Sequence, residues 1–381
     1  MNDKIKQTTT HYKDIYDTII ENATKEWFKS MPKNIINSTS IPTIWEVPSY
    51  SRNQIDKAGK KIATKSYTED EFKNALPILN NWRSSHAYPL QEIANNLRIN
   101  NPDAIVVQRL KRLDSIIAKL QRKRGTSLYT MQDLGGCRVI VESIDDVYKA
   151  LNDYKSSGIK HILKKENDYI REPKESGYRS YHMVYEFKSE TMDSYNKNIL
   201  IEIQFRTKLQ HIWATAVEVM GIYTKSQLKA SIGDEDILRF FVLVSSIFAK
   251  MEHTPICPNT TDDKSLLIKE LKELDKKHNI ISRLSAINVA INHTNEKMKG
   301  MGYYLLRLNF QEQMLKISGF QTEQVEAATN AYNQIESFND PNIDAVLVSA
   351  TSFDELKDAY PNYFTDISKF VSIIRNLLKQ N

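Results

Sequence analysis

The sequence predicts an α+β protein with a mixed sheet at its centre, and three observations support this fold class. The chain has 381 residues, of which 41% are apolar, so it can bury a large core and divide into two or three units. Its middle part changes from a helical hydrophobic period to the alternating period of strands. The segments on both sides return to the helical period, and strand-like runs reappear only after residue 300. We therefore expect helical layers around a central sheet.

The first part of the chain, residues 1–95, is predicted to be a helical N-terminal region. Helical patterns at 11–30 and 69–82 are separated by a connection that is rich in turn formers, including Pro48 and Gly59.

Residues 96–225 are predicted to hold the central domain. The pattern there indicates helices at 103–123 and 143–156 and strands at 136–142, 178–187 and 199–206.

The remainder is divided into a helical extension, 226–300, and a small accessory α/β module, 301–381. In the extension, helices continue to residue 251, and two more are expected within 262–298. In the module, which is expected to be independent, strands are predicted at 303–308, 314–317 and 345–349 and helices at 322–338, 353–359 and 366–379.

Composition excludes several classes of protein. Only two cysteines occur, so neither a disulfide framework nor a four-ligand zinc site is expected. No apolar run is long enough for a membrane helix and no leader pattern is visible, which predicts a cytoplasmic protein without membrane partners. The net charge is +5, but residues 98–124 carry a clear excess of Lys and Arg.

A basic ridge is expected on the helix at 103–123. Lys111, Ser115, Lys119 and Arg122 fall together, opposite an apolar stripe, while Arg109 lies to one side and can stack on a base. A solvated charged face is the ordinary explanation of such a pattern. Because no acid lies within this ridge, a cradle for polyphosphate is the alternative that we favour.

Asp133 precedes a Gly-Gly pair and the strand that carries Arg138. Hard Mg²⁺ prefers one or two carboxylates together with phosphate oxygens, so an acid beside cationic residues suits phosphoryl chemistry. The alternative is that Asp133 only caps a turn.

Two further stretches combine charged and aromatic side chains. In residues 168–182, Lys174 offers a charge for a phosphate, and Tyr178 and His182 share a strand face on which Tyr178 can stack on a purine. In residues 201–207, strict alternation places Glu202, Gln204 and Arg206 on one face, where Glu202 can accept a proton or share a metal with Asp133. Ordinary strand aromatics and an exposed strand face are the alternatives.

Together these motifs resemble the synthetase domain of RelA/SpoT enzymes. The resemblance is carried by Arg109-x-Lys111-x3-Ser115-x3-Lys119, Asp133-x3-Cys-Arg138, Lys174-x2-Gly-Tyr178-Arg-Ser-x-His182 and Glu202-x-Gln204-x-Arg-Thr. It covers roughly residues 95–225 and implies a nucleotidyltransferase-like fold that moves pyrophosphate from ATP to a ribose 3′-hydroxyl with Mg²⁺.

The resemblance also implies a role for each matching residue. Arg109 and Arg138 would hold adenine between them, and Lys111, Ser115, Lys119 and Arg122 would bind the ATP phosphates. Tyr178 would stack on the acceptor guanine, with Lys174, His182 and Gln204 as further acceptor contacts. Asp133 would hold the magnesium, and Glu202 would activate the 3′-hydroxyl. Apart from the resemblance, Arg206 lies on the same strand face as Glu202 and can neutralise developing charge there.

Two departures from the family affect the expected function. The chain has no His-Asp dipeptide of the hydrolase domain of bifunctional members, so we expect synthesis of (p)ppGpp-type alarmones without hydrolysis. The stretch 208–220 differs from that of housekeeping synthetases, which leaves the acceptor open between GTP or GDP and the 3′ end of tRNA. In the second case the protein would be a toxin that blocks translation, for example in phage defence, and Lys123, Arg124, Arg171 and Arg179 are candidate RNA contacts.

A different class of function is a nucleotide-sensing protein without catalysis. The presence of both Asp133 and Glu202 argues against it. The module at 301–381 is the expected contact for a regulatory protein or for a second copy of the chain.

Overall fold

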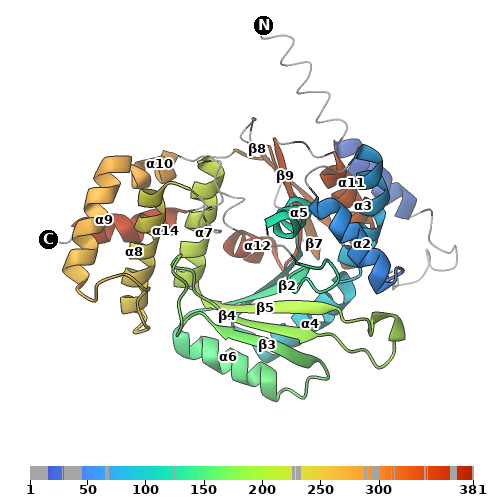
Figure 1. Ribbon diagram of the computed structural model, residues 1–381, viewed down its shortest axis with the longest axis horizontal. Helices are drawn as coiled ribbons and strands as arrows, with labels where there is room; N and C mark the ends of the chain where they lie inside the picture. Colours follow the sequence, from blue (N-terminus) through green and yellow to red (C-terminus); the bar gives the residue numbers. More distant parts are fainter. Residues whose placement is uncertain are drawn as a thin grey trace, which may run out of the picture.

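The computed structural model describes residues 16–27, 29, 45–64, 68–122, 125–224, 228, 233–286, 290–292, 298, 300–309, 311–312, 314–338, 340, 342–360 and 367–379. One mixed sheet runs through the middle of the molecule, with helices on both faces and a helical bundle at one side (Figure 1).

The described strands form this sheet in the order β3-β4-β5-β2-β1-β9-β7-β8-β6. The pairs β2–β5 and β6–β8 are parallel and the other pairs are antiparallel. The strands are β1 (Ile105–Leu110), β2 (Gly135–Val141), β3 (Ile162–Asp168), β4 (Tyr181–Glu186), β5 (Leu200–Thr207), β6 (Ala290–Asn292), β7 (Tyr303–Asn309), β8 (Met314–Phe320) and β9 (Ile343–Ser349). The predicted α+β class, with a mixed sheet and flanking helices, is confirmed.

Helices cover both faces of the sheet and form a bundle beside it. Residues 16–27 are also helical. The other helices are α2 (Arg52–Ala63), α3 (Glu69–Ser84), α4 (Ala87–Asn100), α5 (Leu113–Arg122), α6 (Ile144–Ser156), α7 (Lys208–Tyr223), α8 (Glu235–Met251), α9 (Lys264–His278), α10 (Ile280–Ala286), α11 (Val325–Ser337), α12 (Phe353–Ala359) and α14 (Ser368–Lys379). The N-termini of some helices are specified by local hydrogen bonds, as at the start of α6. The side-chain oxygen of Ser143 accepts a hydrogen bond from the backbone N–H of Asp146, and the carboxylate of Asp146 accepts one from Ser143.

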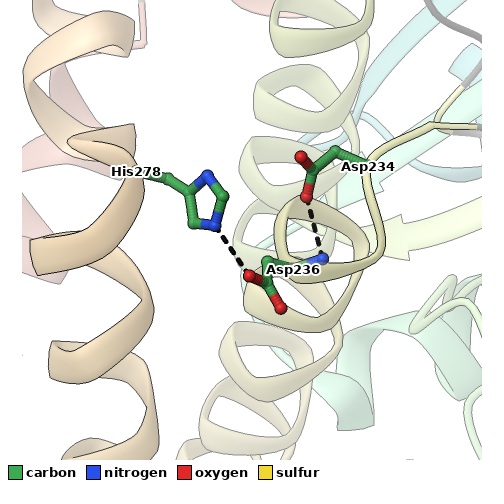
Figure 2. A group of neighbouring side chains, drawn as sticks. All are labelled: Asp234, Asp236 and His278. Carbon is green, nitrogen blue, oxygen red and sulfur yellow. Dashed lines mark hydrogen bonds and ion pairs between the residues drawn. The ribbon is translucent and has the colours of Figure 1, made fainter.

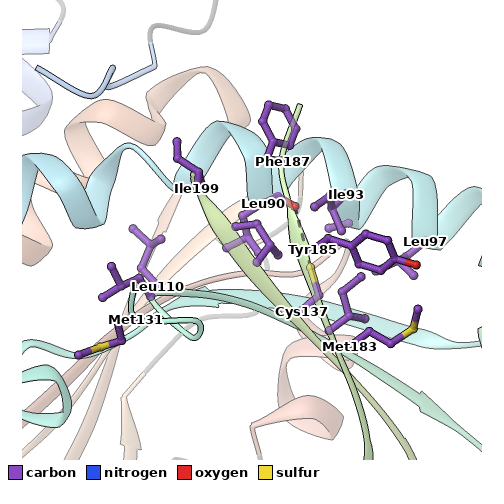
Figure 3. Packing of buried hydrophobic residues seen from close by; sticks show 14 of the residues in the cluster. Leu90, Ile93, Leu97, Leu110, Met131, Cys137, Met183, Tyr185, Phe187 and Ile199 are labelled. Carbon is purple, nitrogen blue, oxygen red and sulfur yellow. Dashed lines mark hydrogen bonds between the residues drawn. The ribbon is translucent and has the colours of Figure 1, made fainter. Parts of the chain in front are cut away.

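The central strands bury one face and leave the other polar. Ile201, Ile203 and Phe205 of β5 are fully buried in the main core. In that core Leu90, Ile93 and Leu97 of α4 meet Cys137, Met183 and Tyr185 of the sheet (Figure 3). Because side chains alternate along a strand, Glu202, Gln204 and Arg206 point to the opposite face. The polar face predicted for this strand is thus the face that α4 and its core leave uncovered.

The prediction of one helix at 103–123 is wrong. Residues 105–110 form β1 at the centre of the sheet, and only 113–122 form a helix, α5. The apolar positions Val106, Leu110 and Leu113 fit a helical period, but the run contains three consecutive β-branched residues, Ile105, Val106 and Val107, which favour a strand. Arg109 therefore projects from a strand, and Lys111 lies in the short connection before α5.

Other elements were missed or shifted. The turn-rich N-terminal connection contains α2, and neither α4 nor β3 was predicted. Gly59, taken as a turn former, lies inside α2, where an added Cβ would approach the Cβ of Leu128 to 2.6 Å. The strand expected from 178 begins at Tyr181, and β6 follows α10 within the range expected to be helical. Residues 11–15, 30–44 and 361–366, which include parts of two predicted helices, lie outside the described residues.

The accessory module is not independent in the structure. β9 pairs with β1 through Gln108 and Arg109, so the strands after residue 300 continue the central sheet. Arg83 of α3 also binds Glu336 of α11. The domain boundaries as such stay predictions. Among the described helices none combines the length and the apolar character that crossing a bilayer requires.

Candidate active site

A carboxylate held by two lysines forms the first half of the site. Asp133 lies just before β2, Lys111 follows β1 and Lys119 is on α5. The two ammonium nitrogens each lie 2.9 Å from a different oxygen of Asp133. Burial alone raises the pKa of Asp133, but the charges of Lys111 and Lys119 outweigh it and hold that pKa at about 2. Asp133 is therefore ionised at neutral pH.

A chain of hydrogen bonds forms the second half. The Tyr178 hydroxyl lies 2.8 Å from Nε2 of His182, and Nδ1 of His182 lies 3.1 Å from Oε1 of Glu202. Gln204 donates to the other oxygen of Glu202 at 2.6 Å, and Arg206 donates to Gln204 at 2.7 Å. The contacts with His182 and Gln204 therefore fix the orientation of the Glu202 carboxylate.

Within this series of hydrogen bonds, the charges favour a protonated His182 next to an ionised Glu202. Burial opposes the charged form of His182, but its contacts with the oxygen of Tyr178 and with Glu202 raise its pKa from 6.5 to about 9. Burial likewise raises the pKa of Glu202, yet the hydrogen bond from His182 brings it below the ordinary value for a glutamate. Glu202 is an ionised acceptor that can take a hydrogen bond from a hydroxyl group.

The sheet register brings the two halves together. β2 and β5 are parallel, and Gly136 lies opposite Glu202 while Arg138 lies opposite Gln204. Asp133 and Glu202 line one cavity of about 60 Å³, together with Lys111, Arg109 and Arg138. The expected convergence of the two carboxylates on one space is therefore present.

Arg109 and Arg138 give this cavity a positive wall, and the charge of Arg206 acts on Arg138 from nearby. Burial, together with the charges of Arg206 and Arg109, lowers the pKa of Arg138 to about 9. The buried Nε atoms of Arg138 and Arg206 have no hydrogen-bond partner within the described part of the chain. Buried N–H groups without an acceptor are costly, and an anionic ligand would supply one.

A segment after α12 covers part of this wall. Arg138 donates to the carbonyl of Ala359 at 3.1 Å, and its guanidinium lies 5.7 Å from the ring centre of Tyr360. Tyr360 is 2% exposed and lines the cavity. The side chain expected to contact adenine therefore already contacts an aromatic ring of the chain itself.

Lys174 is exposed and Tyr178 is half-buried beside the acceptor half of the site. The Lys174 ammonium is 4.1 Å from the ring centre of Tyr169 and 5.3 Å from that of Tyr178. The ring of Tyr169 is also edge-on to His182, with 5.2 Å between the centroids. Tyr169 was missed as a site residue, although it lies in the motif that contains Lys174.

Glycine is needed at the turn before Tyr178. Gly177 has a φ of +85°, and a Cβ there would lie 3.0 Å from both Ser245 and Trp213. This turn sets Tyr178 against His182 without a clash with α7 and α8.

Three predicted phosphate contacts do not line the cavity. Ser115 is half-buried on α5, and Arg122 is exposed at the C-terminal end of that helix. Lys119 shares their helix face, as the spacing predicts, and reaches the site only through its contact with Asp133. The roles of all three stay predictions.

The proposed RNA contact at Arg179 is wrong. Arg179 is 3% exposed and donates to Ser245, to the carbonyl of Ile170 and to Cys257. Arg171 is exposed, while Lys123 and Arg124 lie outside the described residues.

The residues of the cavity fit a magnesium ion. Asp133 and Glu202 both have lowered pKa values and present hard carboxylate oxygens to the same space. Mg²⁺ commonly combines one or two such groups with phosphate oxygens of a substrate. The lysines that neutralise Asp133 in this structure would then turn to those phosphates.

A separate cluster of ligand-type side chains lies on α8 and α9. Asp234, Asp236 and His278 place their ligand atoms within 4.8 Å of one another (Figure 2). However, Asp236 already binds His278 at 2.7 Å and Lys277 at 2.6 Å, and Asp234 caps α8. These contacts explain the cluster as an ion-pair network between two helices.

Comparison with known proteins supports the resemblance. Residues 108–228 match the family described as "Region found in RelA / SpoT proteins". The GTP pyrophosphokinase YjbM of Bacillus subtilis is 36% identical over 118 residues, which are 30% of this chain and 55% of that protein. YwaC of the same organism, also a GTP pyrophosphokinase, is 33% identical over 127 residues, 32% of this chain and 59% of that protein. The chain thus spans little more than half the length of these relatives.

Solved structures of similar proteins were also found. Small alarmone synthetase 1 from Bacillus subtilis, bound to its product pppGpp, is 26% identical, with 44% of this chain and 88% of that chain covered at a TM-score of 0.38. A GTP pyrophosphokinase family protein from Streptococcus pneumoniae is 27% identical, with 49% and 91% covered at a TM-score of 0.37. Scores this low do not bear on the fold, which rests on the strand order above. The predicted RelA/SpoT region is confirmed by the family match at 108–228.

Proposed function

We propose that this protein transfers pyrophosphate from ATP to the 3′-hydroxyl of GTP or GDP. The observation that carries the proposal is the shared cavity of Asp133 and Glu202, with Lys111, Arg109 and Arg138 around it. The similarity to relatives named GTP pyrophosphokinase supports the choice of reaction.

On the donor side, the chain supplies charge for a triphosphate. Lys111 and Lys119 already bind one anion, the Asp133 carboxylate, at 2.9 Å. Phosphate oxygens would take over these ammonium groups, and the arginine pair Arg109 and Arg138 would receive the base. Adenine can stack on a guanidinium, which is the contact that Tyr360 makes with Arg138 now.

On the acceptor side, the chain orients a hydroxyl group. Tyr178 offers a ring for the guanine, and Glu202 accepts the hydrogen bond of the 3′-hydroxyl and then its proton. The new bond joins the 3′-oxygen to the β-phosphorus, and the bond from that phosphorus to the α-phosphate bridge oxygen breaks, so that AMP leaves. Arg206 and protonated His182 stabilise the charge that this in-line displacement moves.

Magnesium would be held by Asp133, with Glu202 as a second carboxylate, and would neutralise charge on the phosphates. Its binding is part of the proposal, as are the absence of hydrolysis and the choice of acceptor.

The test is transfer of label from β-³²P ATP with Mg²⁺ to GTP, GDP or deacylated tRNA in parallel reactions. The proposal predicts labelled guanosine tetra- or pentaphosphate. Label in tRNA alone would identify the toxin alternative, and label in none would contradict both.

A control reaction separates transfer from contamination. Glu175 is exposed in the loop between β3 and β4, so Glu175→Gln should transfer label like the unaltered protein, whereas Glu202→Gln should not. Equal labelling by the two variants would contradict the assignment of Glu202.

A further inference from the structure

A second cavity lies where residues 45–50 meet α3 and α11. Its volume is about 340 Å³, which falls in the range of small-molecule sites and exceeds the space of a few waters. Nothing in the proposed reaction uses it. Its chemistry therefore calls for its own explanation.

The cavity is acidic and has no basic wall. Glu46 and Glu326 line it, and its described lining contains no Lys, Arg or His. An anion such as a nucleotide phosphate would be repelled there, which sets this cavity apart from the arginine-rich one. The charge favours a cation.

One carboxylate oxygen of Glu326 lacks a hydrogen-bond donor. Its Oε2 atom is buried and accepts no hydrogen bond from any described residue. Burial and the nearby charge of Glu46 raise the pKa of Glu326. A buried carboxylate oxygen without a donor is unfavourable, and a ligand with N–H groups and a positive charge would relieve both causes.

The remaining lining suits the same kind of ligand. Trp45 and Tyr50 contribute aromatic rings, which attract organic cations. The side-chain oxygens of Asn80 and Asn333 already accept hydrogen bonds from the buried guanidinium of Arg83. The contacts left for a ligand are therefore those of the carboxylates and the aromatic rings.

We propose that this cavity binds a small organic cation that carries a guanidinium or a protonated amine. Glu326 and Glu46 supply the counter-charges, and the aromatic rings of Trp45 and Tyr50 complete the site. The inference goes beyond pyrophosphate transfer and does not depend on it.

Isothermal titration of the full chain with agmatine and with spermidine tests the proposal, with AMP as the anionic control. We expect saturable binding of at least one cation and none of AMP in this cavity, as judged by competition with the bound cation. Agmatine binding more tightly than spermidine would assign the guanidinium as the recognised group, and the reverse order would assign the amine.

Three variants separate a built site from general charge attraction. Glu326→Gln and Glu46→Gln should each weaken cation binding by at least about tenfold, because each removes a charged acceptor. Glu190→Gln, which changes an exposed glutamate outside the cavity, should bind like the unaltered protein. Absence of cation binding, or equal binding by all three folded variants, would overturn the proposal, whereas a failure of pyrophosphate transfer would leave it standing.

Discussion

The acceptor half and the donor half of the active site differ in what holds their side chains. On the acceptor side, Tyr178, His182, Glu202, Gln204 and Arg206 bind one another in sequence, and all come from β4, β5 or the loop before them. On the donor side, the expected base contact Arg138 binds Ala359 and Tyr360, from a part of the chain far away in sequence. The acceptor half is thus arranged without a ligand, whereas the donor half must exchange a contact within the protein for one with ATP.

The largest expected effect is on the acceptor half. Glu202→Gln should lower the rate of pyrophosphate transfer by about 10²–10⁴-fold, because the amide cannot accept the hydroxyl proton. Single-turnover measurements with saturating ATP report this step directly. A loss of less than tenfold would mean that the chemistry does not use Glu202.

The second effect is on the titration of His182. Its pKa is raised in the folded protein from 6.5 to about 9, which by itself adds stability below about pH 6.5 that is lost as the pH rises through 9. The same contact lowers the pKa of Tyr178 from 10 to about 7, which adds stability at high pH, so the two shifts oppose each other in the free energy of unfolding. NMR titration of the His182 ring should therefore show a midpoint above 6.5 in the unaltered protein and a lower midpoint in Glu202→Gln, which lacks the charged partner. An unchanged midpoint in Glu202→Gln would mean that Glu202 does not hold the imidazolium.

The third effect concerns the donor half. Tyr360→Ala removes the ring from Arg138, and a cation–π contact of about 0.5–2 kcal/mol corresponds to roughly 2- to 30-fold tighter binding of a non-hydrolysable ATP analogue. The matched variant Tyr360→Phe keeps the ring and should bind like the unaltered protein. If both variants bind the analogue with unchanged affinity, the contact between Tyr360 and Arg138 does not compete with ATP.

The smallest effect separates two residues of the predicted basic ridge. Arg122 is exposed, so Arg122→Ala should change the KM for ATP by less than about fivefold, as surface charges contribute at most about 1 kcal/mol. Lys119→Met should raise that KM more, because Lys119 lies 2.9 Å from Asp133. Equal effects would mean that the phosphates extend along α5 beyond the cavity.

How far each part of the site was predictable depends on whether its contacts are local. The alternation in β5 is a period of two, so the shared face of Glu202, Gln204 and Arg206 followed directly from the sequence. The run at 105–110 is short and apolar, and such runs fit a helix or a strand by period alone, so β1 was misread. The expectation of cationic residues beside Asp133 was unaffected by that error, because Lys111 and Asp133 flank neighbouring strands.

The sequence by itself determined the residue types of the site, the polar face of β5 and the RelA/SpoT region that the family match confirms at 108–228. Only the tertiary structure decided that β9 pairs with β1 and that Tyr360 lies against Arg138. The spacing of apolar residues indicates which face of a helix or strand is buried, because the residues of that face recur at a fixed interval along the chain. It does not indicate which distant element buries that face, since that choice depends on the free energy of the whole fold.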